Sequence, residues 1–310
     1  MGSANVLFYF LLILGPIVSI SSSNWVLCWT GIELSFMGMI PLLFTSGVLI
    51  TLSKESSLKY FCVQAFGSSL LFISGLVLYS MLMPLLSLKV LFFLGLCIKL
   101  GVFPGHFWVP SVICGLDWLP SFLLLTVQKI APVALLSNFL AEHTSLQEVS
   151  LLLGGISALV GGMIGNNFTS IRGVIGASSI AHTGWVVIGV VCGYFWLYFF
   201  LYCFTLSLSL LSFHQTSNLA SSFSILSLSG LPPFLMFMGK WSILKASLDS
   251  SIFIGFLILP IVGTFLSLIF YLKFAYSFYL NSDITNLKKE SPILSLLVVN
   301  ILGMVYLVSI

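Results

Sequence analysis

The chain has 310 residues, of which 59% are apolar and 6% are charged. A soluble globular protein carries roughly 25% charged residues. With only 11 Lys and Arg and 8 Asp and Glu, a water-facing surface would expose large apolar patches, which excludes a soluble enzyme, a nucleic-acid binder and a disordered chain. The net charge of +3 is too small to indicate a polyanionic partner. The composition indicates a protein whose solvent is the lipid bilayer.

The apolar segments are continuous rather than alternating, which favours membrane-spanning helices over a β-barrel. At about 20 residues per crossing, the length predicts about eleven crossings joined by short loops. The expected crossings are Val6–Ile20, Trp25–Phe44, Tyr60–Met81, Leu88–Pro110, Trp118–Leu140, Leu151–Asn166, Ile171–Val191, Phe195–Phe213, Ser224–Lys245, Ile252–Lys273 and Pro292–Val308. We therefore expect an all-α polytopic membrane protein with one transmembrane domain over residues 1–310.

The charged residues of the loops predict the orientation of the chain. Basic residues gather on the N-terminal side, at Lys54, Lys59, Arg172, Lys288 and Lys289, with Lys273 at a helix end. The opposite side has Glu142, Glu148 and Asp249, with Lys89 and Lys245 near that face. By the positive-inside rule, the N-terminus lies on the cytoplasm-like side and the C-terminus on the opposite side.

No pattern in the chain is typical of a bound cofactor or metal. The six cysteines form no C-x-x-C pair and no Cys/His metal spacing, so we interpret them as small, buried apolar residues. A Walker loop, a dinucleotide-binding glycine motif and histidines paired for haem are also missing from the sequence. We expect no nicotinamide, flavin, iron–sulfur centre or metal on this chain.

Four charged residues lie inside the apolar segments instead of in loops: Glu33, Lys99, Lys129 and Lys240. A charge near the bilayer centre costs about 2.5–3.5 kcal/mol, so these groups should face one another or a hydrated interior. A purely structural pair between Glu33 and Lys99 is the alternative. Snorkelling to the interface is another alternative, better suited to Lys240, near a segment end, than to the central Lys129.

Three lysines cannot all be paired with one glutamate, so at least one should be partly neutral. Desolvation and repulsion between like charges both favour the neutral form of an amine. A lysine that exchanges its proton inside the membrane is what a proton relay requires.

Glycines and prolines beside two of these lysines predict discontinuous helices. Lys99 precedes Gly101 and Pro104, whereas Lys240 follows Gly230 and the two prolines after it. Such residues inside a crossing free backbone groups that protein or water must satisfy. The opposite order of lysine and break in the two segments is typical of an inverted-topology repeat.

Two histidines are further candidates. His182 lies in the middle of its segment and is either a core residue bonded to a hydroxyl or part of a proton relay. His106 lies close to the inner face and is either an interfacial residue or a group through which protons enter. We interpret Trp25, Trp118 and Tyr271 as ordinary interfacial anchors.

Six short motifs occur in order over roughly residues 5–275. They are Trp29-x-Gly-Ile-Glu33 with Pro41, Lys59-Tyr-Phe-x-x-Gln64, Lys99-Leu-Gly-x-x-Pro-x-His-Phe-Trp-x-Pro110, Leu124-Leu-Thr-x-Gln-Lys-Ile-Ala-Pro132, Ser178-Ser-Ile-Ala-His-x-Gly-Trp185, and Leu228-Ser-Gly-Leu-Pro-Pro233 through Lys240-Trp241. Together they resemble subunit 2 of mitochondrial NADH:ubiquinone oxidoreductase, respiratory complex I, of the animal type. The sequence departs from that family at Gly173, where a second basic residue is usual, and at Gly105, where Phe is usual.

The resemblance implies an antiporter-like subunit with two inverted five-helix repeats, at about residues 5–140 and 150–275, and a final helix at 291–309. It implies a multi-pass protein of the mitochondrial inner membrane, with its N-terminus on the matrix side and its C-terminus on the intermembrane-space side. Other subunits of the complex would be its partners and would carry NAD, FMN and the iron–sulfur clusters. The resemblance assigns Glu33, Lys99, Lys129 and Lys240 to a central hydrophilic axis.

The function expected from these features is proton translocation driven by electron transfer from NADH to ubiquinone elsewhere in the complex. A free-standing cation/proton antiporter is the second hypothesis, and it predicts further carboxylates inside the membrane besides Glu33. A scaffold that is needed only for assembly is the third hypothesis. It predicts that the axis residues can be neutralised without loss of turnover.

Overall fold

The computed structural model describes residues 3–44, 50–80, 85–215, 218–250 and 255–281. Within these ranges all regular structure is helical, and seven helical spans are long and apolar enough to cross a membrane. The expected last crossing, Pro292–Val308, lies outside the described residues. The chain divides into two compact units, Met1–Val149 and Ser150–Ile310.

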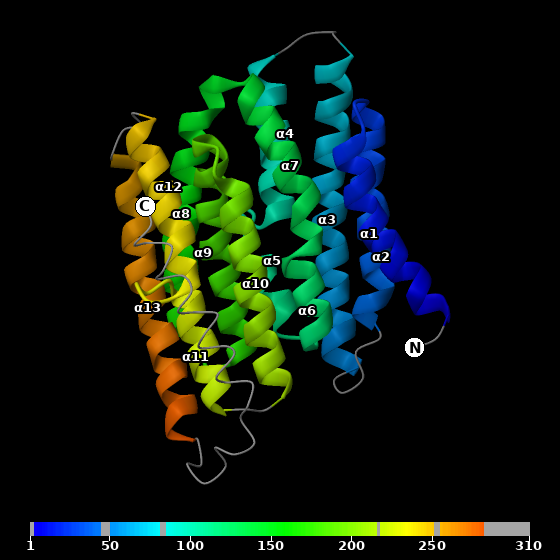
Figure 1. The fold of residues 1–310 in the computed structure, drawn as a ribbon. Helices are drawn as coiled ribbons and strands as arrows, with labels where there is room; N and C mark the ends of the chain where they lie inside the picture. The colour runs from blue at the N-terminus through cyan, green and yellow to red at the C-terminus, as the bar shows by residue number, and fades with distance from the viewer. Residues whose placement is uncertain (1–2, 45–49, 81–84, 216–217, 251–254, 282–310) are drawn as a thin grey trace. The chain divides into compact units, whose positions relative to one another are not determined.

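The first unit is built on a close pair of antiparallel helices, α1 and α2 (Figure 1). A Cβ added to Gly15 of α1 would lie 2.6 Å from the carbonyl oxygen of Gly31 on α2, so the two backbones touch. Small residues at helix contacts allow such close approach in lipid, where no hydrophobic effect holds helices together. The helices of this unit are α1 (Ser3–Ser21), α2 (Trp25–Phe44), α3 (Ile50–Tyr79), α4 (Leu86–Leu100), α5 (Trp108–Ile113), α6 (Trp118–Leu125) and α7 (Val127–Glu142).

In the second unit the other helices pack around α9, and nearly every residue of α9 is buried. Glycines on two faces of α8 let it lie against both α9 and α13: an added Cβ at Gly161 would meet the Ala181 nitrogen at 2.6 Å, and one at Gly162 the Gly263 oxygen at 2.8 Å. The helices of this unit are α8 (Gln147–Asn167), α9 (Ile171–Cys192), α10 (Phe195–His214), α11 (Asn218–Ser229), α12 (Leu235–Asp249) and α13 (Gly255–Leu280).

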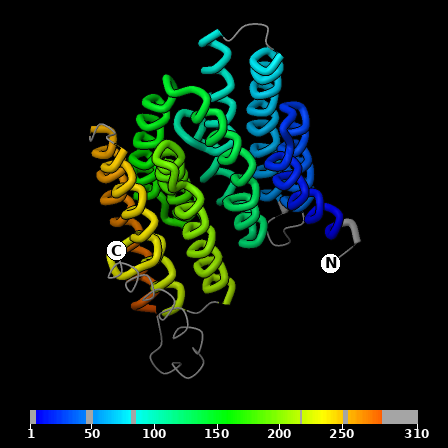
Figure 2. The backbone as a smooth tube through the Cα atoms, turned by 45° about the horizontal axis from the view of Figure 1, so that its top comes forward, coloured from blue at the N-terminus to red at the C-terminus, as the bar shows by residue number. Residues whose placement is uncertain are grey.

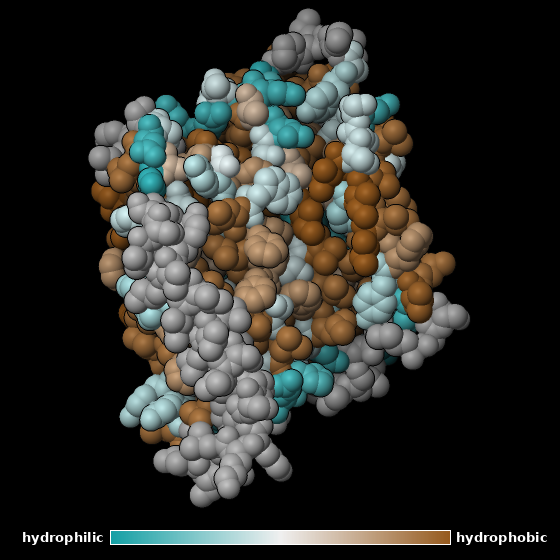
Figure 3. Space-filling model, viewed as in Figure 1, coloured by the Kyte–Doolittle hydropathy of each residue, from teal (hydrophilic) through white to brown (hydrophobic). Residues whose placement is uncertain are grey.

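The outward faces of both units are apolar. Phe10 and Ile73 of the first unit are 60% and 59% exposed, and Phe200 and Phe265 of the second are 70% and 65% exposed. On the visible face of the first unit, brown apolar side chains fill the middle of the helices and hydrophilic ones gather toward the helix ends (Figure 3). Exposure of such an apolar surface to water is unfavourable, whereas the hydrocarbon core of a bilayer solvates it well.

Two crossings are discontinuous, as the sequence predicted. The first ends at Leu100 of α4, where Gly101 takes the left-handed conformation (φ 72°), and resumes as α5 at Trp108. The Gly101 and Val102 amides donate to the carbonyls of Ile98 and Cys97, which is the Schellman pattern that closes a helix.

The second discontinuous crossing has the same form. Helix α11 ends at Ser229, Gly230 is left-handed (φ 73°), and the chain resumes as α12 at Leu235. Both halves lie along α10, and Figures 1 and 2 show them one after the other.

A third interruption was not predicted. The expected continuous crossing Trp118–Leu140 consists of α6 and α7, which meet at Thr126 (φ −114°, ψ −75°). Pro132 lies one to two turns further on, and because proline has no amide hydrogen it weakens the helical ladder here.

We expect Gly101→Ala to destabilise the protein more than Gly193→Ala. Both glycines are left-handed, so alanine costs about 1–2 kcal/mol of backbone strain at either position. At Gly101 the added Cβ would also lie 2.4 Å from Cγ2 of Val109, whereas nothing lies within 4 Å of an added Cβ at Gly193. Thermal unfolding midpoints of the two variants in native membranes measure the difference. Equal midpoints would show that the contact with Val109 relaxes without cost.

Candidate functional site

In the first unit, the charges of α2 and α4 form an ion pair. Nζ of Lys99 lies 3.2 Å from Oε1 of Glu33, and the two side chains are 2% and 18% exposed. The ring of Phe36, one turn after Glu33 on α2, lies 5.8 Å from the same ammonium. A carboxylate and an aromatic face therefore share the stabilisation of this cation.

The backbone at the end of α4 is satisfied by side chains from two neighbouring helices. Nε1 of Trp108, on α5, donates to the Ile98 carbonyl at 3.0 Å, and Nε2 of Gln64, on α3, donates to the Lys99 carbonyl at 3.4 Å. The stem of Lys99 runs past Gly67 of α3, where an added Cβ would lie 3.2 Å from its Cγ. These contacts fix the position from which Lys99 reaches Glu33.

Lys129 is buried near the start of α7, and its neighbour Gln128 ties this segment to α2. Nε2 of Gln128 donates to the Ser35 carbonyl at 2.7 Å, and the Ser35 hydroxyl donates to Oε1 of Gln128 at 3.3 Å. Lys129 is 3% exposed. The turn of α2 that carries Glu33 is thus bonded to the turn of α7 that carries Lys129.

In the second unit, Lys240 reaches back across the helix break that precedes it. Its Nζ donates to the carbonyl of Ser229 at 2.8 Å, and Ser229 is the last residue of α11. An added Cβ on Gly230 would lie 2.8 Å from the same Nζ, so this glycine leaves the space that the ammonium occupies. A cation at the C-terminal end of a helix is stabilised by the helix dipole and by its unpaired carbonyls.

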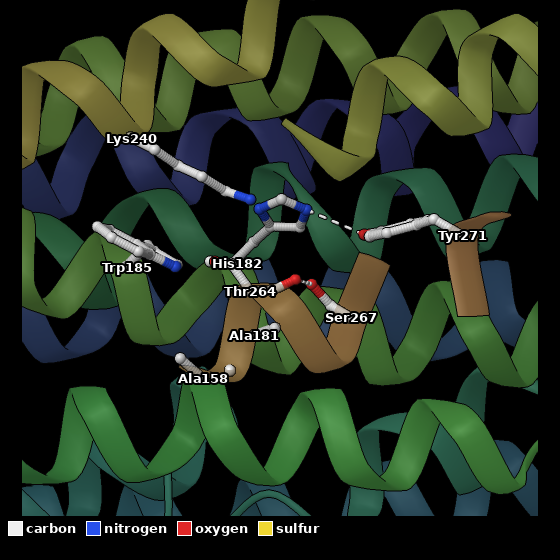
Figure 4. Close-up of a pocket in the computed structure, with 9 residues that line it drawn as sticks. Ala158, Ala181, His182, Trp185, Lys240, Thr264, Ser267 and Tyr271 are labelled. Atoms are coloured by element: carbon white, nitrogen blue, oxygen red, sulfur yellow. Dashed lines mark hydrogen bonds between the residues drawn. The ribbon is translucent and has the colours of Figure 1, made fainter. Parts of the chain in front are cut away.

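His182 of α9 lies beside Lys240 in a small cavity with a volume of about 10 Å³ (Figure 4). One ring nitrogen, Nδ1, lies 2.9 Å from the hydroxyl of Tyr198 on α10, and the other, Nε2, lies 3.2 Å from the hydroxyl of Tyr271 on α13. The cavity is also lined by Thr264 and Ser267 of α13.

The structure corrects the prediction for Tyr271 as an interfacial anchor. Tyr271 is 3% exposed and bonds His182, because α13 continues to Leu280 and keeps this residue inside the unit. Cys62 is exposed, so the expectation of six buried cysteines is also wrong. His106 lies in the connection between α4 and α5, where it is 1% exposed and its ring contacts Phe103 and Phe107.

Sequence reasoning missed Tyr198, Tyr271 and the pair of Ser35 and Gln128. A usable signal existed, because a tyrosine hydroxyl or a side-chain amide inside an apolar segment must find a partner. The sequence could not tell which of several such groups would meet, since this depends on which helix faces pack together.

Chemically, the two units hold ionisable and hydroxyl groups that are able to bind protons away from water. The first has a carboxylate beside an amine, and the second has an amine, an imidazole and hydroxyls around one cavity. Ionisable residues at such positions in membrane helices mark ion or proton pathways.

Discontinuous helices inside a membrane domain are typical of secondary transporters and related membrane proteins. Comparison with known proteins agrees: the family described as "NADH:quinone oxidoreductase/Mrp antiporter, TM" matches residues 22–222. NADH-ubiquinone oxidoreductase chain 2 of Albinaria caerulea is 32% identical over 97% of both proteins, and that of Anopheles gambiae is 35% identical over 89% of this chain and 86% of the relative. The chain belongs to the family of NADH-ubiquinone oxidoreductase chain 2.

Solved structures share the fold. A chain of respiratory complex I from Thermus thermophilus superposes with a TM-score of 0.77 at 22% identity, over 89% of this chain and 71% of that one. A chain of the membrane-bound sulfane sulfur reductase, an archaeal respiratory membrane complex, gives 0.81 at 13% identity, over 98% of this chain and 73% of that one. The architecture is therefore common to membrane proteins with very different sequences.

We expect removal of either Glu33 or Lys99 alone to lower the free energy of unfolding more than removal of both. Glu33→Gln leaves a buried ammonium without its carboxylate, for which we expect a loss of about 3 kcal/mol in the free energy of unfolding. Lys99→Met should also destabilise, and the double variant should recover part of the loss. A double-mutant cycle of unfolding free energies measures the coupling. Strictly additive losses would show that the two residues do not interact.

Proposed function

We propose that this chain is a membrane subunit of NADH-ubiquinone oxidoreductase, respiratory complex I, and that it translocates protons while other subunits transfer electrons from NADH to ubiquinone. Membership of the NADH-ubiquinone oxidoreductase chain 2 family supports the proposal that the chain is a subunit of this complex. The observation that carries the proton-transfer role is the ion pair between the buried Lys99 and Glu33 beside a broken helix.

In this proposal, Glu33 and Lys99 form the gate. Movement of the Lys99 ammonium away from the Glu33 carboxylate weakens its attraction and favours release of its proton. A tenfold change in proton affinity corresponds to about 1.4 kcal/mol, so a small displacement of the pair can drive a transfer step. The Gly101 break supports such a movement, because α4 and α5 are joined by non-helical backbone rather than by a rigid helix.

Lys129 is the central relay in this proposal, Lys240 the exit-side group, His182 a further relay and His106 a group through which protons enter. Burial of Lys129, His182 and Lys240 supports the assignment, since each is at most 8% exposed. Burial of the hydrogen-bonded Lys240 also disfavours the snorkelling alternative.

We further propose a mitochondrial inner-membrane location with the N-terminus on the matrix side, about eleven crossings arranged as two inverted repeats, and redox cofactors confined to other subunits. The asymmetry of basic loop residues supports the orientation. A glycine break in each unit supports the repeats.

A free-standing cation/proton antiporter is less well supported than the complex I subunit. Such a transporter needs carboxylate oxygens for its cation, and among the described membrane helices Glu33 is the carboxylate that faces a buried partner. Glu33 is already engaged by Lys99, which leaves few oxygens for a metal ion.

The Lys129→Met variant tests the relay. Methionine keeps the length of the side chain and removes the group that titrates, so we expect the complex to assemble while NADH-driven proton pumping and ubiquinone reduction fall sharply. Lys54→Met is the control, because Lys54 is an exposed lysine near the start of α3. The measurement is the ratio of protons to electrons in proteoliposomes. Unchanged pumping and turnover in an assembled Lys129→Met complex would favour the scaffold hypothesis.

A further inference from the structure

Gln128 is a polar side chain inside the first unit to which the proposed function gives no role. It lies next to Lys129 in the first turn of α7, and its amide bonds Ser35 of α2. Both ends of the amide are used: Nε2 donates to the Ser35 carbonyl at 2.7 Å, and Oε1 accepts from the Ser35 hydroxyl at 3.3 Å. Ser35 follows Glu33 by two residues. The amide therefore joins the immediate neighbours of two ionisable groups.

The backbone around Gln128 lacks part of the hydrogen bonding of a continuous helix. The chain is interrupted at Thr126, and the Lys129 amide donates to the carbonyl of this residue, three positions earlier, at 3.1 Å. Pro132 has no amide hydrogen to donate to the Gln128 carbonyl four positions earlier. The helix by itself therefore does not fix the direction of the turn that carries Lys129.

Ser35, in contrast, belongs to the close contact between α1 and α2. A Cβ added to Gly15 of α1 would lie 2.6 Å from the Ser35 nitrogen, so the two backbones touch at this residue. Ser35 is 2% exposed, and α2 continues from Trp25 to Phe44 without a break. The amide of Gln128 thus attaches a weakened turn of α7 to a closely packed pair of helices.

The spacing between these turns matters electrostatically. The energy of two charges depends on the distance between them, and it is larger inside a protein than in water. When Lys99 moves away from Glu33 in the proposed gate, the carboxylate loses its partner and attracts other cations more strongly. How much of this change Lys129 senses depends on where its turn is held.

We propose that Gln128 is a positioning residue that holds the turn of Lys129 at a fixed spacing from the turn of Glu33, so that a change of charge at the gate is transmitted to the relay; this inference rests on the proposed function. An amide has no proton to give up in this range of pH, so Gln128 takes no part in proton transfer itself. Its contribution is the constant distance between two groups that do.

The first test measures NADH-driven proton uptake per assembled complex in proteoliposomes with Gln128→Met. Methionine has a similar length and no amide, so the change removes both bonds with Ser35 and keeps a side chain of similar volume. We expect proton uptake to fall about fivefold, as for a barrier raised by the loss of one hydrogen bond.

Gln147→Met is the matched control. Nε2 of Gln147 also donates to a backbone carbonyl of α7, that of Leu140 at 2.9 Å, but this bond lies at the opposite end of α7 from Lys129. We expect this variant to pump at the rate of the unmodified complex. Equal losses in the two variants would assign Gln128 to the packing of α7 and overturn the inference.

The second test detects the coupling between Glu33 and Lys129 in the infrared difference spectrum of the complex. The carboxyl band that Glu33→Gln removes identifies the signal of Glu33. We expect Lys129→Met to shift this band when Gln128 is present and to leave it in place in the Gln128→Met background, since such a cycle isolates an interaction between two sites. A purely structural role of Gln128 predicts the same shift in both backgrounds, and that result would overturn the inference.

Lys129→Met separates this inference from the proposed function. If Lys129→Met impairs pumping while Gln128→Met pumps normally, the inference is overturned and the proposed function stands. If neither variant impairs pumping, both fail. Gln128→Asn replaces Gln128→Met if the latter does not assemble, because its amide ends one carbon short of the position that bonds Ser35. Normal pumping by Gln128→Asn would likewise overturn the inference.

Discussion

A helix that stops inside a bilayer leaves carbonyl groups that lipid cannot satisfy, and the arrangement of both units depends on this constraint. At the end of α4, two closing backbone bonds and the side chains of Trp108 and Gln64 meet the requirement. At the end of α11, the Lys240 ammonium donates to the last carbonyl. The break in the second unit is therefore bonded by the same group that we propose to exchange protons, so that backbone stability and protonation of Lys240 are linked.

The two units place comparable groups in different electrostatic settings. In each, the second helix places a titratable side chain near the lysine at the break: Glu33 of α2 is paired with Lys99, and His182 of α9 lines the same cavity as Lys240. Lys99 faces a full negative charge, whereas Lys240 faces helix carbonyls equivalent to about half a charge. The two lysines therefore differ in what stabilises their charge, a carboxylate for Lys99 and a backbone carbonyl for Lys240.

The sequence was sufficient to predict the helix breaks, because Gly101 and Gly230 readily adopt the left-handed backbone that ends a helix and the prolines after them disfavour its continuation. It also identified the buried charges, since few charged residues interrupt the apolar segments. It could not predict the bond between Gln128 and Ser35 or the role of Tyr271. These contacts depend on the rotation and length of whole helices. The sequence placed the end of the crossing that is α13 at Lys273 instead of Leu280, and this difference was enough to assign Tyr271 to the interface. The interruption at Thr126 has no glycine to mark it.

Besides the lysine and the imidazole, the cavity beside Lys240 and His182 is lined by hydroxyl-bearing, aromatic and small side chains. Each charge at the centre of a bilayer costs about 2.5–3.5 kcal/mol, whereas a hydroxyl that is hydrogen-bonded costs far less. The hydroxyls of Tyr198 and Tyr271 give both nitrogens of the buried imidazole a partner, so His182 does not need a charge nearby. The Lys240 ammonium donates to the last carbonyl of α11, which stabilises its charge. Such an arrangement keeps the core of the unit stable in lipid.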